Sequence, residues 1–281
     1  MKNILKSLFI MLFPALAMWI LVTTLINFNT DNQVLHSIGN LISSSTILFF
    51  FAKIFIKSTA RTSAFLIPYT VSIGIGFILN WIPFTVENSN SLSINSTLLA
   101  GWFLYLFWYS TLTSRNSKKL IVGNKIPEFH LEDASENAIS STAFLGKSTI
   151  YLFYRGNWCP LCMAQIKEVA QQYKELEKRN VTMVLISSQP HKFTESLAEK
   201  HQVPFQFLVD TDNKVAKQLG IFHKNGLPTG FQALGYSSDV VLPTVIITNK
   251  SGEIIFADLT DNYRVRPEPA TFLEIIDSNK G

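Results

Sequence analysis

The chain has 281 residues, of which 47% are hydrophobic and 16% charged, and its formal net charge is +4. Because basic residues flank apolar stretches, this small positive balance gives no support for a nucleic-acid partner. Charges are few before Lys118 and frequent after it. This shift predicts two parts, a transmembrane region at residues 1–117 and a soluble domain at residues 118–281, the second long enough for one hydrophobic core.

Four apolar stretches of the first part are long enough to cross a bilayer core of about 30 Å, which takes about 20 helical residues. They are residues 8–26, 34–56, 64–84 and 97–113. The first is a long apolar run followed by three more, which is not the pattern of a signal peptide. We therefore expect an all-α, multi-pass region of about four helices that anchors the chain in a lipid bilayer.

Charge between these spans predicts their orientation. The basic residues flank alternate ends of the spans: Lys2 and Lys6, then Lys53, Lys57 and Arg61, then Arg115, Lys118 and Lys119. The two remaining loops have only Asp31 and Glu87 as charged residues. The positive-inside rule then predicts that both termini and the soluble domain are cytoplasmic. If the second span, weakened by the polar residues 43–46, does not cross, the soluble domain lies outside instead.

The only two cysteines of the chain, Cys159 and Cys162, are two residues apart. A β-branched and aromatic run predicts a strand at residues 149–155, and Pro160 suits the first position of a helix. A Cys-x-x-Cys at such a junction is typical of a dithiol/disulfide redox centre. A purely stiffening disulfide would close too short a loop, and a zinc site needs more ligands than the chain offers, so we expect no metal and no cofactor.

The two thiols are predicted to be unequal. Cys162 lies on the apolar stripe of the predicted helix with Ile166 and Val169, so it faces the core. Cys159 precedes the helix, where the positive end of the helix dipole favours a thiolate. We therefore expect Cys159 to be the exposed, attacking thiol and Cys162 to be the sheltered, resolving one.

The rest of the soluble domain alternates strands with helices. We expect a hairpin near residues 129–131, strands at 181–187, 205–209, 244–248 and 253–257, helices at 160–178, 192–201 and 213–219, a looser segment at 222–238, and a last helix opened by Pro267 and Pro269. This order predicts an α/β fold, a three-layer sandwich with a mixed sheet.

Pro243 stands at the entrance of the strand at 244–248, where proline does not break a ladder. Together with the Cys-x-x-Cys, the sequence Leu242-Pro243-Thr244 resembles the thioredoxin-like superfamily, in which a cis-proline packs beside the two cysteines. The resemblance implies a substrate groove formed by Trp158, Pro160, Leu242, Pro243 and Thr244. An ordinary trans-proline is the alternative that the base rate of X-Pro bonds favours.

Within that superfamily the closer resemblance is to the redoxin branch, the alkyl hydroperoxide reductase/thiol-specific antioxidant (AhpC/TSA) and peroxiredoxin-like proteins. It covers about residues 120–278, with matching segments at 123–133, 145–147, 153–162, 187–188, 207–212 and 215–220. The resemblance implies an enzyme that acts on a disulfide or a peroxide and takes electrons from a thiol donor.

Differences from these relatives leave both reactions, disulfide exchange and peroxide reduction, as alternatives. Alignment on Phe153 puts Cys162 on the peroxidatic position of peroxiredoxins and Cys159 on their Thr/Ser. The arginine of that family is missing near residues 242–244, and Arg155 is interpreted as a solvated charge. Phe153 also replaces the buried aspartate of thioredoxin.

Three functions follow from this pattern. The main expectation is a membrane-anchored thiol-disulfide oxidoreductase, in which Cys159 attacks a protein or small-molecule disulfide and Cys162 releases it. The first alternative is a peroxiredoxin-like thiol peroxidase, in which Cys162 is peroxidatic and Cys159 resolving. The second is a non-enzymatic redox sensor.

Overall fold

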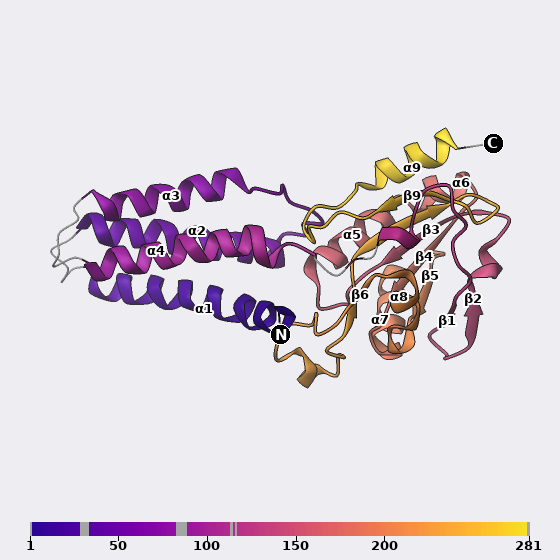
Figure 1. Ribbon diagram of the computed structural model, residues 1–281, viewed down its shortest axis with the longest axis horizontal. Helices are drawn as coiled ribbons and strands as arrows, with labels where there is room; N and C mark the ends of the chain where they lie inside the picture. The colour runs from indigo at the N-terminus through magenta and orange to yellow at the C-terminus, as the bar shows by residue number, and fades with distance from the viewer. Residues whose placement is uncertain (1, 29–33, 83–88, 113–114, 116, 280–281) are drawn as a thin grey trace. The chain divides into compact units, whose positions relative to one another are not determined.

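A computed structural model describes residues 2–28, 34–82, 89–112, 115 and 117–279 (Figure 1). The chain divides into two compact units. The first, here called the helical unit, comprises Met1–Lys57 and Thr62–Thr111. The second, here called the redox unit, comprises Leu112–Gly281 together with Ser58–Arg61, a short segment from inside the helical part of the sequence.

The helical unit consists of α1 (Lys2–Asn27), α2 (Val34–Ile56), α3 (Ile67–Trp81) and α4 (Ser89–Phe103), which continues as a π-helical stretch, Leu104–Tyr109. Among the described residues, Asn3–Asn27 and Val34–Ile56 are long and apolar enough to cross a membrane. The span predicted at 64–84 corresponds to α3, which is shorter. Pro68 lies in the first turn of this helix, so the helix begins at Ile67. Four spans therefore remain a prediction. Asp31 and Glu87, on which the loop charges depend, lie outside the described residues.

Polar side chains of the helical unit pair with one another inside an otherwise apolar bundle. Ser43 Oγ donates to Asn95 Oδ1 at 2.6 Å, and His36 Nδ1 lies 3.1 Å from Asn80 Oδ1. At Gly76 a Cβ atom would lie 2.7 Å from the carbonyl oxygen of Gly39, so α2 and α3 approach closely there. Small residues and internal polar pairs of this kind are typical of helices packed in an apolar surrounding.

The redox unit is built on a seven-stranded sheet in the order β2-β1-β5-β4-β3-β8-β9 (Figure 1). Its strands are β1 (His130–Glu132), β2 (Ala138–Ser140), β3 (Ser148–Phe153), β4 (Val181–Ser187), β5 (Gln206–Val209), β8 (Thr244–Thr248) and β9 (Ile254–Asp258). Strands β3, β4 and β5 are parallel, whereas β8, β9, β1 and β2 are antiparallel to their neighbours. The predicted mixed sheet is confirmed. A separate two-stranded ladder pairs β6 (Phe222–His223) with β7 (Val240–Val241).

The helices of this unit are α5 (Pro160–Gln171), α6 (Tyr173–Lys178), α7 (His191–His201), α8 (Lys214–Leu219) and α9 (Pro269–Ser278). All five residues of β8 are buried, as are five consecutive residues of β3, so both faces of the sheet centre are covered. That burial is what a three-layer sandwich requires. The helix predicted at 160–178 is interrupted at Gln172, and the last helix begins at Pro269 rather than at Pro267.

Candidate functional site

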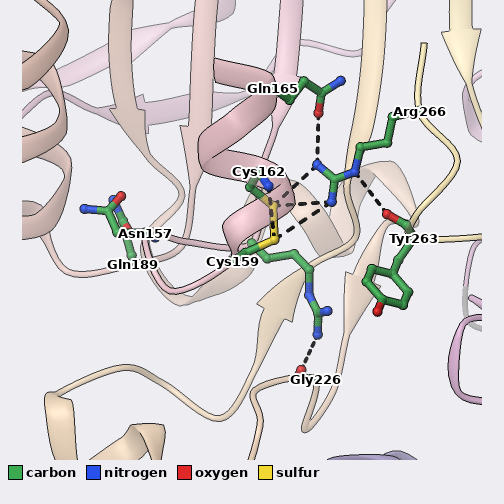
Figure 2. Close-up of a disulfide and its surroundings, with 9 residues drawn as sticks. Asn157, Cys159, Cys162, Gln165, Gln189, Gly226, Tyr263 and Arg266 are labelled. Carbon is green, nitrogen blue, oxygen red and sulfur yellow. Dashed lines mark hydrogen bonds between the residues drawn. A yellow bond between two sulfur atoms is a disulfide. The ribbon is translucent and has the colours of Figure 1, made fainter. Parts of the chain in front are cut away.

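A tight turn after β3 presents the cysteines. Gly156 has φ +141°, and a Cβ atom there would lie 2.7 Å from Trp158 Nε1, so the turn favours glycine on both grounds. Gln189, which follows β4, lies beside Asn157 of this turn (Figure 2). Its Oε1 accepts from the Asn157 amide at 2.8 Å, and its Nε2 donates to the Tyr154 hydroxyl and to Asn157 Oδ1, both at 3.1 Å.

The cysteines form a disulfide, Cys159–Cys162, at the first turn of α5 (Figure 2). Cys159 is the N-cap residue, and its Sγ accepts from the backbone N–H of Cys162 at 3.3 Å. Cys159 is only 3% exposed and Cys162 is fully buried. The expectation of an exposed Cys159 is therefore wrong for the disulfide state, because neighbouring segments cover the helix N-terminus.

A buried guanidinium, that of Arg266, lies against the disulfide (Figure 2). Its Nη2 and Nη1 are 3.4 and 3.5 Å from Cys162 Sγ, whereas only Nη2 approaches Cys159 Sγ, at 3.9 Å. Nη1 also donates to Gln165 Oε1 at 2.9 Å, and Nε donates to the Tyr263 carbonyl at 3.0 Å. The guanidinium is thus fixed by groups on both sides and is directed mainly at Cys162.

Burial, and in second place the nearby charge of Arg155, lower the pKa of Arg266 to about 10. This value is well above neutrality, so Arg266 is cationic at pH 7. Sequence reasoning missed this residue. The only signal was local, two arginines in Tyr263-Arg-Val-Arg266-Pro267, just before a predicted helix.

Arg155 is also buried, at 7% exposure, so its interpretation as a solvated charge is wrong. Its guanidinium carbon lies 4.8 Å from the ring centre of Trp158, and its Nη2 donates to the carbonyl oxygen of Gly226. The cation–π contact and the hydrogen bond explain why the charge is held inside instead of in solvent.

The loop before β8 departs from the expected geometry. The described residues contain no cis peptide bond, so the prediction of a cis-Pro243 is wrong. Arg115 holds this loop: its Nη2 donates to the Pro243 carbonyl at 3.0 Å and its Nη1 to Thr244 Oγ1 at 2.7 Å. The trans isomer is also the intrinsically favoured one, by about 0.5–1 kcal/mol.

The predicted groove is closed at this loop. Leu242, Pro243 and Thr244 are all buried, whereas Trp158 and Pro160 are half-buried. Pro243 and Thr244 do lie near the site, because they line one small cavity with Gln165 and Arg266. Its volume of about 10 Å³ is roughly that needed for one water molecule. Among the described residues, no group of three or more His, Cys, Asp or Glu side chains gathers to hold a metal ion.

A Cys-x-x-Cys disulfide at the start of a helix, after an interior strand of a mixed α/β sheet, is the arrangement of the thioredoxin-like fold. A model of the AhpC/TSA family matches residues 122–257. This part of the chain is therefore similar to the AhpC/TSA, peroxiredoxin-like proteins.

Individual relatives match the same part of the chain. A chloroplastic peroxiredoxin Q from Sedum lineare is 30% identical over 103 residues, which are 37% of this chain and 55% of the plant protein. A putative peroxiredoxin bcp from Haemophilus influenzae is 25% identical over 159 residues, 57% of this chain and 97% of that protein. The crystal structure of the peroxidoxin BcpB from Mycobacterium tuberculosis is 17% identical, covers 57% of this chain and 98% of that one, and has a TM-score of 0.46.

Proposed function

We propose that the redox unit is a thiol peroxidase, in which Cys162 reduces the peroxide and Cys159 resolves the product. The peroxiredoxin-like family match supports this assignment over the thiol-disulfide oxidoreductase that the dipole argument favoured. The observation that carries it is the direction of Arg266, whose two terminal nitrogens approach Cys162 Sγ at 3.4 and 3.5 Å. A buried cation there stabilises the thiolate of Cys162 more than that of Cys159.

The reaction balances without a cofactor. The Cys162 thiolate attacks one oxygen of ROOH, so that an S–O bond forms, the O–O bond breaks, and RO⁻ leaves and takes up a proton to give ROH. The Cys159 thiol then attacks the sulfenic sulfur, forms the disulfide and releases water. The dithiol has lost two electrons, which an external thiol donor returns by thiol–disulfide exchange.

Peroxide consumption by single-cysteine variants tests this assignment. In the full chain, Cys159→Ser should reduce one equivalent of hydrogen peroxide and accumulate sulfenic acid on Cys162, detectable by a dimedone adduct. Cys162→Ser should consume peroxide at least about a hundredfold more slowly, because Cys159 has a single, longer contact with Arg266. If Cys162→Ser instead keeps the activity and forms mixed disulfides with added protein disulfides, Cys159 is the attacking thiol and the chain is a disulfide oxidoreductase.

We also propose that the helical unit crosses a lipid bilayer four times and keeps the redox unit in the cytoplasm. The alternation of basic segments with loops free of lysine and arginine supports this orientation. Two long apolar helices support the membrane location, as do exposed apolar side chains along α1, such as Leu12 at 64% and Ile26 at 72% exposure.

A further inference from the structure

Residues 225–239, here called the flap, form a loop that closes on itself. The Leu227 amide donates to the Ser238 carbonyl at 3.1 Å, and the Asn225 amide donates to Asp239 Oδ1 at 2.8 Å. These bonds form a neck next to the ladder of β6 and β7, whose strands flank the loop in the sequence. A loop whose ends meet in this way is a compact body.

The body of the flap has hydrogen bonds of its own. It contains a 3₁₀ helix, Phe231–Leu234, flanked by Gly230 and Gly235, which both have positive φ. Gln232 accepts from the Gly230 amide at 3.0 Å and donates to Ser238 Oγ at 3.2 Å. Displacing the flap therefore need not break this internal network.

Contacts with two neighbouring segments help to hold the flap: the turn that carries the cysteines, and α7. Arg155, which stacks on Trp158, donates to the carbonyl of Gly226. The Trp158 and Phe231 rings are 5.9 Å apart. At the far end, the Phe193 ring of α7 stacks on Tyr236 at 4.5 Å.

Because the two sulfurs are buried, the contacts of the flap affect which molecules can reach them. Cys159 is at a helix N-terminus beside half-buried residues, yet only 3% of it is exposed. A partner the size of a protein cannot bring a sulfur atom to Cys159 through so small an opening. A molecule of a few atoms needs much less displacement of the cover.

We infer that the flap is the size-selective gate of the dithiol, closed by Phe231 on Trp158, Tyr236 on Phe193 and Gly226 on Arg155. Closed, it admits small oxidants and excludes protein-sized thiols and disulfides. Open, it exposes Cys159 to the macromolecular donor that returns the electrons. This inference concerns access to the sulfurs and does not depend on peroxide being the substrate.

Alkylation of the reduced full chain tests the gate without using any enzymatic activity. The probes are iodoacetamide, which is small, and a maleimide carried on a polyethylene glycol chain, which is bulky. In the double variant Phe231→Ser/Tyr236→Ser the bulky probe should react about tenfold faster, because two aromatic contacts that hold the flap are lost. The rate with iodoacetamide should change by less than about twofold.

Two further variants calibrate the result. Leu234→Ser removes an apolar side chain of the same flap that is 60% exposed, and it should leave both rates unchanged. Tyr236→Ser alone releases only the contact with α7 and should give an intermediate rate with the bulky probe. An equal acceleration of both probes would mean general loosening of the site, and no acceleration would mean that another segment covers the sulfurs; either result overturns the gate.

Discussion

Arg266 lies 104 residues after Cys162 in the sequence, yet its guanidinium is in direct contact with both sulfurs. Its position is determined by two acceptors, the Gln165 side chain and the Tyr263 carbonyl. The guanidinium contacts the disulfide, and in the proposed reaction the same group stabilises the Cys162 thiolate. The rate of the first chemical step should therefore depend on it.

Replacing Arg266 with methionine should slow the reaction with hydrogen peroxide about a hundredfold at pH 7, because the thiolate of Cys162 loses its charged donor. The rate should then rise with pH towards the range of an ordinary thiol, about 8.5, whereas the wild-type rate stays level there. Stopped-flow measurement between pH 6 and pH 9 checks both statements.

The lysine variant of Arg266 is the matched control, since it keeps the charge but presents one point donor instead of two. It should recover part of the rate and keep a level pH profile. A methionine variant with a wild-type pH profile would contradict the assigned role.

At the level of elements, several segments follow from their own sequence. Strands β4 and β8 have the predicted bounds, because each is an apolar, β-branched run between turn residues. The start of α5 is likewise predicted by Pro160. The rest depends on tertiary contacts that leave no local pattern: the burial of Arg155, the trans bond at Pro243 held by Arg115, and the cover over Cys159.

Asp210 shows how an element can be fixed by one side chain. It follows β5 directly, and its two carboxylate oxygens accept from the amides of Val215 and Ala216, both at 2.8 Å, in the first turn of α8. Burial outweighs these hydrogen bonds and raises the pKa of Asp210 to about 6. The folded state therefore holds its proton more tightly than the unfolded chain, whose aspartates titrate near 3.9.

The pKa of Asp210 is higher in the folded state than in the unfolded state. The contribution of its proton to the free energy of unfolding is therefore complete below about pH 4 and is lost as pH rises through about 6. Asp210→Asn cannot titrate. The stability advantage of the wild type over this variant should shrink by about 1 kcal/mol from pH 5 to pH 7. Unfolding midpoints of both oxidised proteins, measured side by side at several pH values, check this; a constant gap would mean that the carboxyl does not titrate in that interval.

At the scale of the whole molecule, the orientation of the redox unit is a separate prediction from its chemistry. A reporter fused after Gly281 should behave as cytoplasmic, because the basic residues favour that side. The matched control is the replacement of Lys53 and Lys57 by glutamine, which weakens the charge bias without touching the cysteines. Periplasmic or extracellular behaviour of the unaltered fusion would contradict the prediction and imply an odd number of spans.

The redox unit is discontinuous in sequence, and this constrains how the chain can thread a membrane. Ser58–Arg61 belongs to it, with Arg61 paired to Glu168 on α5, and so does everything from Leu112 onward. Parts of one compact body must lie on one side of a bilayer, so the chain between residues 61 and 112 crosses an even number of times. Whether α3 and α4 both cross or both fail to cross, the side of the redox unit is unchanged. The side of the redox unit relative to the N-terminus then depends only on whether α1 and α2 together cross an even or an odd number of times. Among the described residues these are the two helices long and apolar enough to span.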